Sequence, residues 1–140
     1  MLSTSLFSRE IIYQDFAIRN IVSVYDGDTF RVNLLCKEPL LCSNIPIRIF
    51  GINTPERRGG SGTDTEKRKA KIAQKYTYKF LKNSRVRLVN CFRGKYFRLV
   101  CNVKSELNED ISDYLINTGY AVPYFGGTKT KDWSDENDGL

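Results

Sequence analysis

A turn and an alternating strand follow one another in DGDTFRVNL (residues 26–34). Phe30, Val32 and Leu34 alternate with polar residues, which is the period of two expected of a β-strand with one buried face. The segment before it, residues 17–24, has the pattern of another strand, and the Asp-Gly pair favours a turn between the two. This part of the chain therefore predicts an antiparallel β-hairpin.

Strand patterns recur in three later segments. In residues 45–49 (IPIRI) isoleucines alternate with Pro46 and Arg48. Residues 86–91 and 97–103 also have the composition of strands, and Arg93-Gly94 between them suits a turn. Together with the hairpin, these segments give five predicted strands.

Two amphipathic helices are predicted between and after these strands. From residue 65 onward apolar residues recur at steps of three and four, and Thr63 and Glu66 match a capping box at the start. The second helix is expected to begin with Asn108 as its N-cap and acids in its first turn, and to stop at Gly119. The positions concerned are Ala70, Ala73, Tyr76 and Phe80 in the first helix, and Glu109, Asp110, Ile111, Tyr114 and Leu115 in the second.

The order of these elements is three strands, a helix, two strands and a helix. It predicts an α+β fold that is mainly β: a five-stranded Greek-key OB-fold barrel with one helix inserted after strand 3 and another after strand 5. We expect the domain to span residues 14–130. Residues 1–13 are predicted to be an N-terminal extension and residues 131–140 a polar tail outside the barrel.

Composition limits the classes of function. The chain has 140 residues, the usual size of one domain, and a net charge of +6 that favours a polyanionic partner. It has no apolar run long enough to span a membrane and no signal-peptide pattern at its start, which favours an intracellular protein, although the compartment stays open. With no heptad pattern or obvious apolar patch, a monomer is expected. The absence of histidine excludes Ser-His and Cys-His nucleophiles and histidine metal sites.

The four cysteines do not indicate a metal site. Cys36, Cys42, Cys91 and Cys101 form no Cys-x-x-Cys pair and have no histidine partner, so zinc binding is poorly supported. The burial preference of cysteine predicts reduced thiols in the core. A disulfide that closes the small loop from Cys36 to Cys42 is the alternative, and the sequence does not decide between them.

Two arginines are candidates for binding phosphate. Arg48 and Arg98 each lie on a predicted strand at the parity opposite to their apolar neighbours, so both should point away from the core. A guanidinium binds phosphate through two parallel hydrogen bonds, and hydrolysis of a phosphodiester needs fixed positive charge facing the phosphate oxygens. The alternative is that they are solvated arginines on a basic surface.

Three motifs occur in order along the chain: DGDT at residues 26–29, RIFGINTPE at residues 48–56 and KYFR at residues 95–98. Through them the chain resembles the staphylococcal nuclease-like (thermonuclease) family over about residues 18–129. The order and spacing of the motifs also match the barrel predicted from periodicity. The resemblance implies a calcium-dependent nuclease that hydrolyses DNA and RNA with activated water and leaves 3′-phosphate products.

The resemblance also implies roles for individual residues. Arg48 and Arg98 would stabilise the transition state, and Glu56 would orient and deprotonate the attacking water. Because a free carboxylate is a weak base at neutral pH, metal assistance and an alkaline optimum are expected. Tyr96 and Tyr124 would contact the nucleotide, with core packing as the alternative.

Oxygen ligands for a metal are present in the first two motifs. Asp28, Asn53 and the carbonyl of Thr54 suit calcium or magnesium rather than zinc or copper, and the resemblance implies calcium. Asp26 is interpreted as a turn residue or as a support for these ligands. The best-known family members have aspartate in place of Asn53, and an amide offers an oxygen without a charge, which predicts a raised calcium requirement.

Two classes of function remain open. The first is a sugar-nonspecific nuclease for single-stranded or frayed DNA and RNA, because phosphates carry no sequence information. The second is a catalytically weak or inactive OB-fold that binds nucleic acid or protein. The four charged site residues favour the enzyme, whereas Asn53 favours the binding module. The four residues are Asp28, Arg48, Glu56 and Arg98.

Overall fold

The computed structural model describes residues 10–137 and contains a closed five-stranded barrel. The order around the barrel is β1-β2-β3-β6-β5, and β1 pairs with β5 to close it. The pairing of β3 with β6 is parallel and the other pairings are antiparallel. This confirms the predicted OB-fold barrel, mainly β. The strands are β1 (Gln14–Asp26), β2 (Thr29–Leu34), β3 (Ile45–Ile49), β5 (Val86–Arg93) and β6 (Leu99–Ser105).

The interior of the barrel is built from the alternating residues of its strands. Phe30 and Val32 of β2 and Ile47 of β3 are completely buried, and Leu88 and Val103 meet them from β5 and β6. Their intervening neighbours face outward, as the period of two requires. The hydrophobic faces of β2 and β3 are therefore the ones that the sequence predicts.

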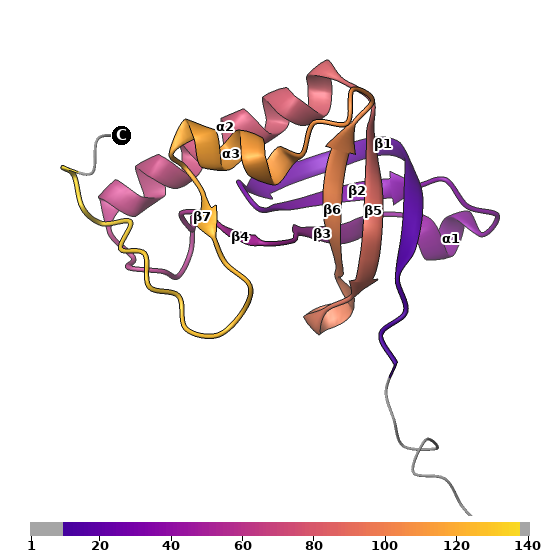
Figure 1. Cartoon of the computed structure of the whole chain (residues 1–140), viewed down its shortest axis with the longest axis horizontal. Coiled ribbons are helices and arrows are strands. Elements are labelled where there is room, and N and C mark those ends of the chain that lie inside the picture. The colour runs from indigo at the N-terminus through magenta and orange to yellow at the C-terminus, as the bar shows by residue number, and fades with distance from the viewer. Residues whose placement is uncertain (1–9, 138–140) are drawn as a thin grey trace, which may run out of the picture.

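Two helices lie along the same side of the barrel, as Figure 1 shows. α2 (Asp64–Asn83) buries Ala70, Ala73 and Phe80, which are positions of the predicted apolar face. α3 (Ile111–Thr118) buries Ile111 and Leu115. Beside these helices, β4 (Ile52–Asn53) pairs with β7 (Val122–Pro123), and α1 (Pro39–Cys42) is a single turn between β2 and β3.

The start of α3 differs from the prediction. Asn108 has a left-handed φ of 64°, and the N-cap is instead Asp110, whose carboxylate accepts a hydrogen bond from the backbone N–H of Ser112. Glu109 and Asp110 therefore precede the helix rather than forming its first turn. Gly119 ends the helix in the left-handed conformation, as predicted.

The start of β6 also differs. The strand begins at Leu99, and Lys95–Phe97 forms a short 3₁₀ turn before it. Tyr96 and Phe97 have φ values of 58° and 61°, which no extended strand adopts. Phe97 is 85% exposed and Arg98 precedes the strand, so the prediction that a strand spans residues 97–103, with Arg98 on it and the apolar Phe97 on its buried face, is wrong for these two residues.

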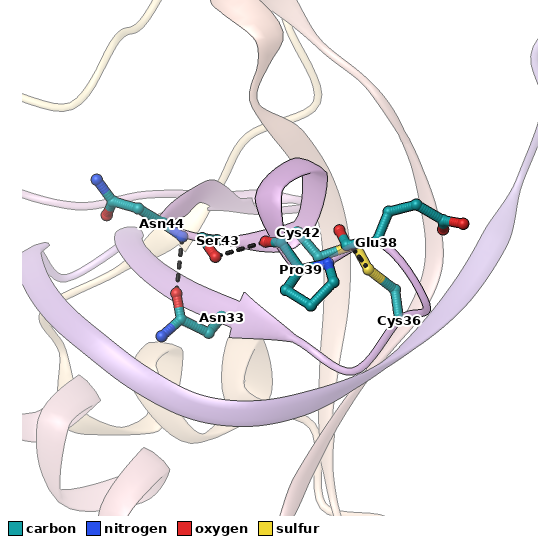
Figure 2. The surroundings of a disulfide bond; sticks show 7 residues. All are labelled: Asn33, Cys36, Glu38, Pro39, Cys42, Ser43 and Asn44. Carbon is teal, nitrogen blue, oxygen red and sulfur yellow. Dashed lines mark hydrogen bonds between the residues drawn. A yellow bond between two sulfur atoms is a disulfide. The ribbon is translucent and has the colours of Figure 1, made fainter.

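The cysteines form two disulfides, so the expectation of reduced thiols is wrong. Cys91 and Cys101 are buried and join β5 to β6. The Cys36–Cys42 disulfide closes the segment between β2 and β3 that contains α1 (Figure 2). This segment is also held where the backbone N–H of Asn44 donates to the side-chain oxygen of Asn33.

The end of the described chain packs on α2. The side chain of Trp133 is 3% exposed, the hydroxyl of Thr65 donates to the Glu136 carboxylate, and the ammonium of Lys69 donates to the carbonyl of Asp135. The predicted tail is thus attached to a helix over residues 131–137. Residues 1–9 of the predicted extension and residues 138–140 of the tail lie outside the described residues. Between residues 10 and 137, none of the helices combines the length and apolar character needed to cross a lipid bilayer.

Candidate active site

The β1–β2 hairpin places Asp28 next to α2 and the chain that follows β4. Asp26 pairs with Thr29, so Gly27 and Asp28 form a two-residue turn. A Cβ on Gly27 would lie 2.9 Å from the Cβ of Ala73 and 3.0 Å from a side-chain carbon of Thr54, so only glycine allows this approach. The turn and α2 are joined where the hydroxyl of Thr77 donates to the Gly27 carbonyl at 2.6 Å.

Asp28 connects two of the other predicted site residues. One carboxylate oxygen accepts a hydrogen bond from the backbone N–H of Thr54 at 3.3 Å and lies 3.3 Å from a guanidinium nitrogen of Arg48. The other oxygen accepts from the hydroxyl of Thr29 at 2.9 Å. Two residues of the second motif therefore meet the carboxylate of the first motif.

Arg48 is held in a fixed orientation beneath the surface. Its side chain is 13% exposed, and its guanidinium donates to the carbonyls of Ile49 and Ile52, both at 2.7 Å. A guanidinium has five N–H groups, so the contacts to the two carbonyls and to Asp28 leave donors for a ligand. The expected outward direction from the barrel core is met, although the side chain is not freely solvated.

Arg98 reaches the same place from the turn that precedes β6. β3 and β6 are parallel with Arg48 opposite Val100, so residue 98 lies two positions before the partner of Arg48. Its Nε is buried and has no hydrogen-bond partner within residues 10–137. Arg48 and Arg98 line one cavity of about 290 Å³, here called the arginine cavity. Its wall also includes Phe50, Phe92, Tyr124, Phe125 and Lys129.

A second cavity, of about 260 Å³, contains Glu56 and is here called the loop cavity. Asn53 and Thr54 line it from one side, and the glycine-rich segment after Glu56 lines it from another. Lys129 lines both cavities, and its ammonium pairs with a carboxylate oxygen of Glu56 at 2.8 Å. The two cavities are therefore neighbours with Lys129 between them.

One of the predicted metal ligands is an oxygen atom that has no hydrogen-bond donor among the described residues. The side-chain oxygen of Asn53 is buried and accepts no hydrogen bond from the residues that the structure describes. Such an acceptor needs a partner, and a hard cation is one that fits an amide oxygen. The described residues contain no cluster of three or more His, Cys, Asp or Glu, so a bound ion would depend on Asn53 and the Thr54 carbonyl as well as on Asp28.

The two predicted nucleotide-contacting tyrosines lie in different surroundings. Tyr124 lines the arginine cavity, and its hydroxyl donates to the Gly127 carbonyl at 2.6 Å. Tyr96 is 88% exposed and lines neither cavity. The structure thus brings Tyr124, but not Tyr96, to the arginines.

Comparison with protein families gives a match to the staphylococcal nuclease homologue model over residues 46–137. The chain belongs to this family. The matched region begins in β3 and covers all the predicted site residues except Asp28. A comparison with curated protein sequences finds no significant match.

Two contacts within the candidate site of this staphylococcal nuclease homologue were not predicted from the sequence. Lys129 pairs with Glu56 across 73 positions of the sequence. Glu66 was expected to complete a capping box; Thr63 does accept from the Glu66 backbone N–H at 3.2 Å, but the Glu66 carboxylate binds the backbone of the Glu56 loop instead. The sequence signal was an acid a few residues after a glycine-rich loop. An acid at such a position can either cap the helix or bind the loop, so the signal does not distinguish the two roles.

Asp26 supports the same loop from the other side. Its carboxylate is buried and accepts from the backbone N–H of Arg57 at 3.2 Å. Burial, together with the charges of Asp28 and Glu56, raises the pKa of Asp26 from 3.8 to about 6, against the lowering effect of the hydrogen bond from Arg57. Asp26 therefore helps to hold the loop in position, and its protonation changes the negative charge near Asp28 and Glu56.

Proposed function

We propose that this protein is a metal-dependent, sugar-nonspecific nuclease that hydrolyses phosphodiester bonds of DNA and RNA. Arg48 on β3 and Arg98 in the turn before β6 line one cavity that adjoins the cavity of Glu56, and this observation carries the proposal. Membership of a nuclease family and the net charge of +6 support a nucleic-acid substrate.

The chain supplies the base and the positive charge for this reaction. Glu56 accepts a proton from water as the water oxygen bonds to phosphorus. The bond from phosphorus to the 5′ oxygen then breaks and this oxygen takes a proton from solvent water, which leaves a 3′ phosphate and a 5′ hydroxyl. Arg48 and Arg98 offset the negative charge that develops on the phosphate oxygens, and their contribution depends on being held in place before the substrate arrives.

Calcium, or magnesium in its place, would be held by Asp28, Asn53 and the carbonyl of Thr54. When bound, such an ion polarises a phosphate oxygen and favours ionisation of nearby water. Because the Asp28 carboxylate already contacts Arg48 and Asn53 carries no charge, we expect weak metal binding in the absence of substrate.

Single strands are the expected substrates, because phosphate contacts require no base pairing and the cavity wall includes aromatic side chains that a base can contact. The protein is expected to act as a monomer.

The test is an assay of fragment length with single-stranded DNA in calcium, in magnesium and in chelator, with Glu56→Gln alongside. Cleavage that needs the metal and falls by at least about 100-fold in the variant is the expected result. Intact DNA at millimolar calcium, with binding retained, would instead support a nuclease-derived binding module. The pairing of Glu56 with Lys129 and the amide at Asn53 are the observations that favour this second function.

The amide at position 53 gives a separate prediction. Asn53→Asp adds a negative charge to the metal ligands, so the calcium concentration for half-maximal cleavage should fall by about 10-fold or more. Asn117→Asp, at an exposed position of α3 that lines neither cavity, is a control for the added charge. An unchanged calcium requirement in Asn53→Asp would show that residue 53 does not limit metal binding.

A further inference from the structure

One buried carboxylate outside the predicted catalytic set holds both ends of the loop that begins with Glu56. Glu66 lies in the first turn of α2 and is 2% exposed. One of its oxygens accepts from the backbone N–H of Glu56 at 2.8 Å, and the other accepts from the backbone N–H of Ser61 at 2.9 Å. The first of these contacts is made to the backbone of the proposed base itself.

The loop is also shaped to fit around this carboxylate. Gly60 has a φ of 55°, and a Cβ on it would lie 2.2 Å from an oxygen of Glu66. Any other residue at position 60 would have to displace either the loop or the Glu66 side chain. The sequence between Glu56 and Ser61 is thus adapted to close contact with Glu66.

The helix that carries Glu66 is itself fixed to the barrel. Further along α2, Thr77 donates to the carbonyl of Gly27, and the side-chain amide of Gln74 donates to the carbonyl of Val24 at 2.6 Å. The position of the Glu66 carboxylate is therefore set by the same scaffold that carries Asp28. A hydrogen bond to an ionised acceptor is stronger than one between neutral groups, which suits a contact that has to hold a loop.

We propose that Glu66 is the positioning residue for Glu56: it fixes the backbone of the proposed base relative to the arginine cavity and takes no proton itself. This inference rests on the proposed nuclease function. A displacement of about 1 Å of a catalytic group lowers rates by about 100-fold, so a contact to the backbone of Glu56 has a large effect on catalysis.

The experiment compares Glu66→Gln with the native protein. The amide has the same shape but places an N–H₂ group against one of the two backbone N–H donors. We expect kcat to fall by about 10-fold to 100-fold while KM changes by less than about twofold, because the arginines are untouched. Asp64→Asn, an exposed acid in the same turn of α2, is the matched control and should leave kcat unchanged.

The double variant separates positioning from other roles. If Glu66 acts through Glu56, adding Glu66→Gln to Glu56→Gln should lower the residual rate by less than about twofold. An equal loss in both backgrounds would overturn the inference, because it would indicate a general structural role or a direct part in the reaction. A kcat for Glu66→Gln equal to that of the native protein would overturn it as well.

Amide hydrogen exchange keeps the test independent of activity. In Glu66→Gln the backbone N–H groups of Glu56 and Ser61 should exchange at least about tenfold faster, with no such change at the centre of α2. This measurement can be made even if the native protein does not cut DNA. A lack of cleavage would refute the proposed function but would leave the role of Glu66 in holding the loop to be decided by hydrogen exchange. Unchanged exchange at both positions would refute the role of Glu66, and faster exchange throughout α2 would show loss of the helix instead.

Discussion

Phe97 is a bulky residue in a backbone conformation that normally suits glycine. Its φ is 61°, which is strained for a residue with a Cβ. Its side chain is largely exposed, so packing of the ring contributes little stability to offset this strain. Phe97→Gly should therefore stabilise the protein by about 1 kcal/mol, as measured by urea unfolding.

The control for this change is Leu107, which is also exposed but does not have a positive φ. Leu107→Gly increases the freedom of the unfolded chain without relieving strain, so it should lower stability by about 0.5 to 1 kcal/mol. If Phe97→Gly destabilised the protein as well, the left-handed conformation would not be a source of strain.

Asp26 makes stability depend on pH. Its folded-state pKa of about 6 lies above the ordinary value of 3.8, so the folded protein keeps a proton that the unfolded chain has already lost. Stability should therefore fall as pH rises from about 4 to about 6, and Asp26→Asn should remove this fall. At pH 7 the variant should be more stable by up to about 3 kcal/mol. Urea unfolding in chelator across this pH range is the measurement, and equal pH dependence in both proteins would contradict the prediction.

Contacts among the candidate site residues are most predictable where local sequence decides the position of each residue. Asp28, Arg48 and Thr54 lie in or beside short motifs on strands and turns, and they meet in the structure. The partners of Glu56 and Glu66 could not be predicted, because a carboxylate accepts from any nearby donor. Which donor is near depends on how the loop folds over α2 and on where the chain returns to Lys129.

At the scale of elements, the two disulfides differ in accessibility more than in loop length. Cys91 and Cys101 are buried between β5 and β6, whereas Cys36 and Cys42 are half-buried at the edge of an exposed turn. A reductant must reach the sulfur that it attacks. Mild reduction without denaturant should thus open Cys36–Cys42 at least about tenfold faster than Cys91–Cys101.

Alkylation followed by mass spectrometry identifies which cysteines have been released. Loss of Cys36–Cys42 should lower stability by about 2 kcal/mol, as expected for a short loop, and should leave the barrel folded. Equal rates of reduction for the two disulfides would indicate that the barrel opens readily between β5 and β6.

The elements themselves were predicted well where a period is sustained and poorly at their ends. Alternation identified the barrel strands, because a strand with one buried face must alternate. The errors at Phe97 and Asn108 both come from residues in the left-handed conformation. Such a residue interrupts a strand or helix, but the sequence around these two positions does not indicate it. The Cys91–Cys101 disulfide was missed for a related reason, since it lies where the register of β5 against β6 shifts.

At the scale of the whole molecule, the segment over residues 131–137 covers the start of α2. Trp133→Ala would remove a large buried side chain and should cost about 3 kcal/mol of stability, measured by urea unfolding. Asn137→Ala, an exposed position in the same segment, should change stability by less than about 0.5 kcal/mol. A small effect of Trp133→Ala would mean that the segment contributes little to the fold.

The barrel topology was predictable because only a few arrangements accommodate five short strands and two helices in this order. The attachment of residues 131–137 was not, because one tryptophan among polar residues gives no periodic pattern. The contacts of this segment with Thr65 and Lys69 connect positions more than 60 residues apart, and no local rule relates them.

The packing of Trp133 gives the protein an optical probe of its own. The chain has a single tryptophan, and this residue lines the loop cavity together with Glu56 and Asn53. The ammonium of Lys131 lies 5.1 Å from the centre of its ring, so the indole is surrounded by charge that a bound ion or phosphate would alter. Intrinsic fluorescence should therefore respond to occupancy of the site in the unlabelled protein, including inactive variants in which cleavage reports nothing.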